Sequence, residues 1–167
     1  PYQIVKGLEF YQRKEIRDVV GYLQLINNPR NDAAFRRIIN TPPRQIGKAT
    51  VERLAEHANR YNTSLLEAAR TAGLIETITK RAASHIAAFV ALFDRLNLIA
   101  AQPLHDLLET VLRDSKYVEW LADSEEDEDQ ERLANIRELV SAASDFDLQH
   151  PGSNQLEEFL EQVALVA

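Results

Sequence analysis

A chain of 167 residues, 45% of them hydrophobic, is long enough to bury one core without disulfides or a structural metal. The absence of cysteine excludes a disulfide framework and a thiolate metal site and favours a reducing, cytoplasmic setting, and no apolar run approaches the roughly 20 residues that span a bilayer. Methionine is also absent and the chain begins at Pro1, so we expect it to be a piece excised from a longer protein.

The net charge of −7 is distributed unevenly along the chain. Residues 1–60 hold 11 Lys and Arg against 6 Asp and Glu, a balance of +5, whereas residues 61–167 hold 8 against 20, a balance of −12. The acidic average argues against a nucleic-acid partner, because like charges repel phosphate. The basic first third is the part that such a partner would bind.

The first predicted element is a short extended segment. Tyr2, Ile4 and Leu8 alternate with polar residues, a pattern too small for a sheet of its own, so its pairing strands would come from elsewhere. From residue 13 to residue 26 the apolar positions recur at helical spacing, and Asn27-Asn28-Pro29 ends that helix.

The next two predicted helices flank a proline-containing segment. Asn31 or Asp32 can cap a short helix that reaches residue 39. Thr41-Pro42-Pro43 must break it, because proline lacks the amide donor. Gly47 then opens a further helix that extends to residue 58.

The rest of the chain reads as a series of helices. Ser64 and Glu67 form a capping-box pair for a short helix through Ala72, which Gly73 is placed to end. Residues 76–99 form the longest apolar-periodic stretch and are expected at the centre of the fold. Further helices are predicted over residues 103–115, 133–143 and 153–166, and residues 117–121 form a short apolar segment.

The acidic run Asp123–Glu131 is predicted to be an exposed loop, and His150-Pro151-Gly152 to separate the last two helices. No strand pattern or repeat follows Phe10. The predicted fold is therefore an all-α bundle of about eight or nine helices.

The segment from Phe35 to Leu54 carries the most specific signal. Two short helices joined by an apolar-Gly-basic turn, with Thr50 three residues after Gly47, resemble a helix-hairpin-helix DNA-binding element. Glycine permits close approach of a phosphate, and the unpaired N–H groups and dipole at the start of the second helix favour an anion. Lys48 and Arg44 add charge and Thr50 adds a hydroxyl donor, so the turn would hold a phosphodiester without reading bases. The same pattern also fits a plain turn between two core helices.

Other sites are not indicated. The four histidines do not fall at metal-ligand spacing, and the acidic run lacks the glycine that a calcium loop requires. The sequence contains no G-x-x-x-x-G-K-S/T phosphate loop, no serine elbow and no H-E-x-x-H helix. We therefore expect neither catalytic residues nor a metal site in this chain.

Residues 2–18, YQIVKGLEFYQRKEIRD, resemble a signature of the UvrD/Rep/PcrA-like superfamily 1A DNA helicases. Residues 21–23 (GYL) and 28–32 (NPRND) follow in the family's register, and residues 37–47 (RIINTPPRQIG) are similar to a family segment that ends in R-G-I-G. The ordered agreement covers about 50 residues. Beyond residue 60 the resemblance is limited to the helical layout and the acidic gap.

Two positions depart from the family pattern. Lys6 stands where the family has the first of two glycines, and Gln45 replaces the first glycine of the G-I-G turn. The second departure puts a close phosphate approach at Gln45 in doubt, whereas Gly47 retains it.

The resemblance implies a helical 2B subdomain inserted into the second RecA-like motor domain of an ATP-dependent helicase. Residues 1–10 would then be the end of a motor (2A) strand with its hinge, and residues 11–167 the 2B subdomain. ATP and Mg²⁺ would bind the parent protein, so this fragment would be inactive alone. In the family, 2B contacts the duplex ahead of the fork through its G-I-G turn and swivels to regulate unwinding.

The expected partners are duplex DNA, through its phosphate backbone, and the other subdomains of the parent chain. The residues expected to contact DNA are Arg17, Arg44, Ile46, Gly47, Lys48 and Thr50. Arg13 and Glu15 are expected to pair and to order the hinge between motor and 2B. Two other classes of function stay open: a free-standing helix-hairpin-helix module of a repair protein, and a helical protein-interaction domain that uses its acidic C-terminal two-thirds.

Overall fold

The computed structural model describes residues 7–152 and 154–166. Those ranges contain helices and no strand, which confirms the all-α fold. The helices, in chain order, are α1 (Leu8–Tyr11), α2 (Lys14–Asn27), α3 (Asp32–Ile38), α4 (Lys48–Tyr61), α5 (Leu65–Arg70), the 3-10 helix η1 (Ala72–Leu74), α6 (Lys80–Leu98), α7 (Leu104–Asp114), α8 (Tyr117–Ala122), α9 (Asp127–Gln149) and α10 (Gln155–Val166). None of the described helices is both long and apolar enough to cross a bilayer.

Side-chain caps set several of the helix boundaries. Asn31 Oδ1 accepts a hydrogen bond from the N–H of Ala34 at 3.0 Å, which confirms the predicted cap of α3. Ser64 Oγ likewise accepts from the N–H of Glu67 at 3.2 Å and caps α5. The start predicted for the longest apolar helix, at residue 76, is wrong: Thr79 caps α6, so this helix begins at Lys80.

The acidic run Asp123–Glu131 is only partly the exposed loop that its composition predicts. α9 begins at Asp127, so the second half of the run is helical. Carboxylates in the first turn of a helix are stabilised by the positive end of the helix dipole. Arg132, one turn further on, also binds Glu128 at 2.9 Å and Asp129 at 2.7 Å. Charge density alone did not distinguish a helix start from a loop.

The N-terminal segment differs from its prediction at Leu8. Leu8 begins the helical turn α1 instead of continuing an extended segment. Phe10 and Tyr11 in the same turn are buried, and the Tyr11 ring lies edge-on to Phe159 of α10 at 6.3 Å. Tyr2 and Ile4, the other residues of the predicted extended pattern, lie outside the described residues.

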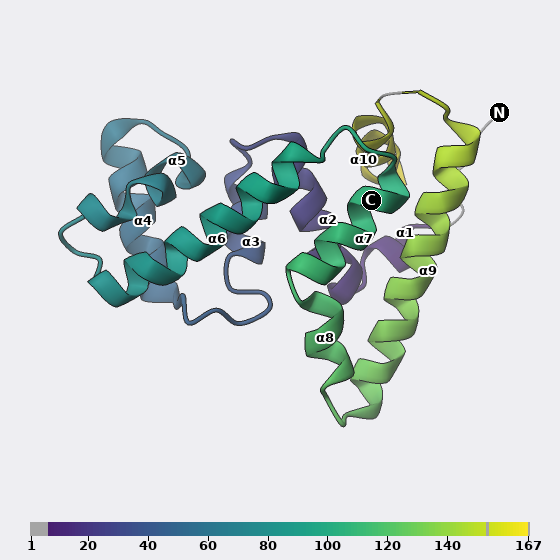
Figure 1. Ribbon diagram of the computed structural model, residues 1–167, viewed down its shortest axis with the longest axis horizontal. Helices are drawn as coiled ribbons and strands as arrows, with labels where there is room; N and C mark the ends of the chain where they lie inside the picture. The colour runs from purple at the N-terminus through teal and green to yellow at the C-terminus, as the bar shows by residue number, and fades with distance from the viewer. Residues whose placement is uncertain (1–6, 153, 167) are drawn as a thin grey trace.

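The helices form two groups joined by α2, α3 and the long helix α6 (Figure 1). α4 and α5 pack together at one end of the molecule, and α7, α8 and α9 pack together at the other. α6 contacts α5 and η1 in the first group and α7 in the second. The α3–α4 connection runs from the middle of the molecule to α4 in the first group (Figure 1), and α9, which carries much of the acidic run, belongs to the second.

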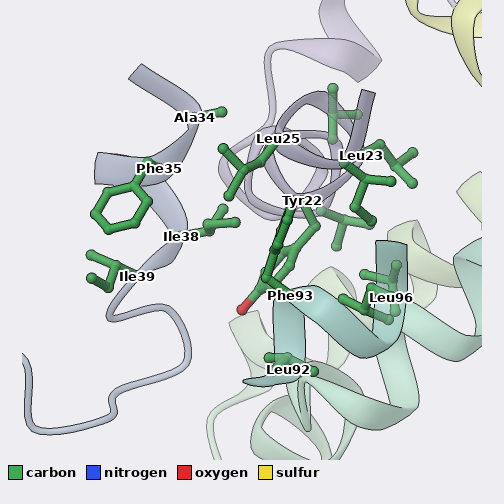
Figure 2. Packing of buried hydrophobic residues seen from close by; sticks show 14 of the residues in the cluster. Tyr22, Leu23, Leu25, Ala34, Phe35, Ile38, Ile39, Leu92, Phe93 and Leu96 are labelled. Atoms are coloured by element: carbon green, nitrogen blue, oxygen red, sulfur yellow. The ribbon is translucent and has the colours of Figure 1, made fainter. Parts of the chain in front are cut away.

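α2 is the central element of the core. It packs against α3, α6, α7, α9 and α10, and ten of its 14 residues are buried. Figure 2 shows Tyr22 of α2 between Ile38 of α3 and Phe93 of α6. A Cβ on Gly21 would lie 2.9 Å from Ile38 Cγ2, which is too close for a normal contact. α2 and α3 can pack at their present separation because residue 21 has no side chain.

A buried carboxylate ties α2 to α3 and α8. Asp18 is 3% exposed, and its Oδ2 accepts a hydrogen bond from the Tyr117 hydroxyl at 2.8 Å and contacts Lys14 Nζ at 3.1 Å. Its Oδ1 lies 3.0 Å from Arg37 Nε. Burial, and secondarily the Asp18 charge, raises the pKa of Tyr117 well above its ordinary value, so Tyr117 acts as a neutral donor here.

Candidate nucleic-acid interface

Asn40 orders the connection between α3 and α4. Its Oδ1 accepts hydrogen bonds from the N–H of Arg44 at 2.6 Å and from the N–H of Ile46 at 3.1 Å. One side chain thus satisfies two backbone donors of a segment that has no secondary-structure partner. Asn40 belongs to residues 37–40 (RIIN), which are part of the family resemblance. Its role in the turn could not be predicted from residue spacing, because it depends on how the backbone of residues 44–46 folds back toward Asn40.

The Arg44 side chain points into the protein. Its Nη1 donates to the carbonyl oxygens of Ile38 at 2.7 Å, Ile39 at 3.1 Å and Thr41 at 3.4 Å. Its Nη2 donates to the Tyr22 hydroxyl, which in turn donates to the Thr41 carbonyl. The guanidinium therefore joins the end of α3 to α2 and is not presented to solvent as a phosphate ligand.

Aromatic rings enclose the same guanidinium. Arg44 Cζ lies 5.3 Å from the centre of the Phe89 ring and 5.8 Å from that of Tyr22. Burial raises the pKa of the Tyr22 hydroxyl, while the neighbouring Arg44 acts in the opposite direction. Arg44 thus stabilises the fold. Its position in a basic turn had instead predicted a DNA contact.

Ile46 is likewise an anchor of the turn. Its side chain is 1% exposed, and its N–H is taken by Asn40. Neither the side chain nor the N–H of Ile46 is available to a ligand. Ile46, the apolar residue of the predicted apolar-Gly-basic pattern, instead packs the turn against the core.

Gln45 carries the backbone strain of the turn. Its φ is +61°, in the left-handed region that favours glycine, while Gly47 has an ordinary φ of −78°. Gln45 also stands where the motif that residues 37–47 resemble has a glycine. Its Oε1 accepts a hydrogen bond from Arg81 Nη2 of α6 at 3.0 Å, so the side chain brings a cation to the turn from 36 residues away.

Replacing Gln45 with glycine should therefore be tolerated. We expect the free energy of unfolding to stay the same or to rise by up to about 1 kcal/mol. Glycine relieves the strain of the left-handed backbone, and this gain outweighs the cost of the greater conformational entropy of glycine in the unfolded chain. Gln45→Val, which is β-branched, should instead destabilise by about 1–2 kcal/mol. Urea denaturation of both variants checks this, and equal losses for the two would contradict it.

Gly47, Lys48 and Thr50 form an open helix terminus. Gly47 is the N-cap of α4 without a side-chain cap, and the first bond of the helix is from Val51 N–H to the Gly47 carbonyl at 3.1 Å. The N–H groups of Lys48, Ala49 and Thr50 precede that bond and have no intrahelical acceptor. A Cβ built on Gly47 would meet nothing within 4 Å, and Lys48 is exposed. An anion can therefore approach these donors.

Arg17 does not lie with this group. It is exposed on α2 and borders a cavity of about 250 Å³ together with other residues of α2, α3 and α10, among them Gln24, Ala33 and Val163. Tyr22, which faces Arg44, is five residues from Arg17 and thus about 140° around the helix. The structure accordingly brings together Arg44, Ile46, Gly47, Lys48 and Thr50, but not Arg17.

Arg13 and Glu15 meet at a third residue instead of pairing directly. Arg13 Nη1 donates to Asn135 Oδ1 at 2.7 Å, and Asn135 Nδ2 donates to Glu15 Oε2 at 2.7 Å. Arg132 Nε lies 4.0 Å from Glu15 Oε1. Both predicted hinge residues thus fasten the start of α2 to α9, more than 100 residues away in sequence.

Comparison with known proteins identifies the family. The pattern of the family described as "UvrD-like helicase C-terminal domain" matches residues 1–167. The chain is 38% identical to the ATP-dependent DNA helicase PcrA of Leuconostoc citreum, over 88% of this chain and 20% of that protein. It is 37% identical to the ATP-dependent DNA helicase UvrD1 of Mycobacterium bovis and 34% identical to DNA helicase II of Escherichia coli, in each case over 100% of this chain and 24% of the relative.

The chain therefore spans about a fifth to a quarter of the length of the curated relatives it matches. The match of the family pattern to all 167 residues agrees with the motif resemblance of residues 2–47 and extends it over the acidic helices. The chain belongs to the UvrD-like helicase C-terminal domain family.

Proposed function

We propose that this chain is the helical 2B subdomain of an ATP-dependent UvrD-like DNA helicase, and that the α3–α4 turn holds the backbone of duplex DNA. Its family membership and the helicase names of its relatives support the parent activity. The observation that carries the DNA contact is the uncapped, solvent-facing N-terminus of α4, with Gly47 leaving room for a phosphate and Lys48 beside it.

The contact divides its residues into two roles. Backbone N–H groups after Gly47, the Lys48 ammonium and the Thr50 hydroxyl would bind phosphate oxygens. Arg44 and Ile46 would act indirectly, because their side chains and the Ile46 N–H hold the turn in place. Arg81, bound to Gln45, adds positive charge near the turn.

The remaining parts of the helicase cycle would belong to the rest of the parent. Residues 1–10 would lead in from the motor domain, and Arg13 and Glu15 would order that junction through Asn135. ATP and Mg²⁺ would bind motor motifs that this sequence does not contain, so the 167-residue chain alone should not hydrolyse ATP.

Duplex binding should be weak, salt-sensitive and without sequence preference. About three phosphate contacts predict a slope of about −3 in a plot of log K against log salt, and dissociation constants on the order of 10⁻⁴ to 10⁻⁶ M. The net charge of −12 over residues 61–167 shifts the expected dissociation constant toward the weak end of this range. Anisotropy titrations of a labelled blunt duplex measure the slope, and a value near zero would refute a phosphate-backbone contact.

A further inference from the structure

A groove lies in the acidic half of the molecule, in the helix group that does not contain the α3–α4 turn. It is formed by α7, α8 and α9 and has a volume of about 550 Å³. Its apolar lining consists of Leu112, Val118, Leu133, Ile136 and Val140. Leu112, Leu133 and Ile136 also belong to the hydrophobic core, whereas Val118 and Val140 are only partly buried. Val118 and Val140 therefore form the exposed part of an apolar floor, with the three core side chains beneath them.

Charged side chains from the same helices border the groove. Glu119 borders it on α8 and contacts Lys116 at 3.8 Å, an exposed pair of little strength. Arg113 borders it on α7, but its charge is offset by Asp114 at 3.1 Å. Glu109 of α7 and Arg137 of α9 complete the border. The border therefore carries both signs, and the adjacent acidic segment sets the net charge.

The segment that connects α8 to α9 is strongly negative. Residues 123–131 contain seven carboxylates. Among the described ion pairs only Glu128 and Asp129 have a cationic partner, and both share Arg132. The segment ends two residues before Leu133, so uncompensated negative charge lies beside one end of the apolar floor.

We propose that this groove docks an amphipathic helix of a partner protein, with apolar residues toward α7, α8 and α9 and Lys or Arg toward residues 123–131. An apolar groove between helices accepts such a helix through residues spaced i, i+3, i+4 and i+7. The negative segment selects basic flanks and repels nucleic acid. The groove is thus a protein site, separate from the proposed DNA contact.

The test uses a dye-labelled Leu/Lys amphipathic peptide of about 18 residues, or five helical turns, and a Leu/Glu peptide of the same pattern. We expect the Leu/Lys peptide to bind one to one and the Leu/Glu peptide to bind at least about tenfold more weakly. Val140→Glu should weaken binding at least about tenfold, because it places a charge on the apolar floor. Glu119→Lys, a change on an exposed side chain, should weaken it about three- to fivefold without affecting folding.

Glu161→Lys is the matched control, since it makes the same charge change on an exposed face of α10 outside the groove. Equal losses for Glu119→Lys and Glu161→Lys, or equal affinity for the two peptides, would overturn the proposal. So would displacement of the peptide by duplex DNA, or self-association of the chain that Val140→Glu abolishes without any peptide binding. Loss of duplex binding at the α3–α4 turn would leave this result unchanged.

Discussion

Replacing Arg44 with alanine should lower the free energy of unfolding by about 3–5 kcal/mol, because hydrogen bonds from a charged group to several carbonyls are lost together. The carbonyls of Ile38, Ile39 and Thr41 and the Tyr22 hydroxyl would lose their shared donor. Arg44→Lys should recover only part of the loss, because an ammonium cannot reproduce the planar fork of donors. Urea denaturation followed by circular dichroism measures both.

Arg53→Ala is the control for this prediction. Arg53 is an exposed arginine of α4, and no hydrogen bond or ion pair involves its side chain in the described part of the chain. Its removal should change stability by less than about 0.5 kcal/mol. A folded Arg44→Ala variant of near-normal stability that no longer binds duplex DNA would show that Arg44 faces the ligand, contrary to the inward orientation described above.

Asp18→Ala should cause the second large loss, about 3 kcal/mol. Removing one partner of a buried ion pair usually costs about 3–5 kcal/mol, and the value here lies at the lower end because Arg37 and Lys14 keep some contact with water. The Tyr117 hydroxyl would also remain buried without its acceptor. α2, α3 and α8 should loosen together, which thermal unfolding followed by tryptophan fluorescence can report, since the single Trp120 lies in α8.

Asp94→Ala provides the comparison on the surface. Asp94 is 49% exposed and forms a two-pronged contact with Arg70 at 2.9 and 3.0 Å, which lowers the pKa of Asp94. An exposed pair of this kind contributes about 1 kcal/mol or less. If Asp94→Ala destabilised the protein as much as Asp18→Ala, burial would not be the reason for the importance of Asp18.

Local signals in the sequence predicted the fold well. Helical periodicity located α2, and the side chains of Asn31 and Ser64 located the starts of α3 and α5, because capping depends on neighbours within three residues. The cap of α7 by Asp147 could not be predicted from local signals. Asp147 caps α7 from α9 by accepting hydrogen bonds from Leu104 N–H at 2.9 Å and His105 N–H at 2.8 Å, across more than 40 residues.

The candidate site was predicted only in part for the same reason. The position of Gly47 before a helix follows from the local pattern, whereas the direction of the Arg44 side chain depends on Tyr22 and Phe89 from two other helices. Two other contacts also join distant segments. Arg13 and Glu15 both bind Asn135, and Arg81 binds Gln45. Residue type and spacing carry no information on such contacts.

The most direct test of the proposed interface is a duplex titration of Lys48→Glu against Lys116→Glu at about 50 mM salt, where electrostatic contacts are weakly screened. Lys48 is the first residue of α4, where a glutamate is favourable to the helix dipole, so the variant should fold at least as well as the parent. Lys116 is 75% exposed, lies between α7 and α8, and undergoes the same charge change.

Lys48→Glu should weaken duplex binding about tenfold and reduce the salt slope by about 1, whereas Lys116→Glu should weaken it about twofold at most. Gly47→Val should match the loss in affinity, because its side chain would occupy the space left for the phosphate, while the ordinary φ of Gly47 leaves folding intact. Equal losses for Lys48→Glu and Lys116→Glu would show that bulk charge accounts for binding, and would contradict a DNA contact at the N-terminus of α4.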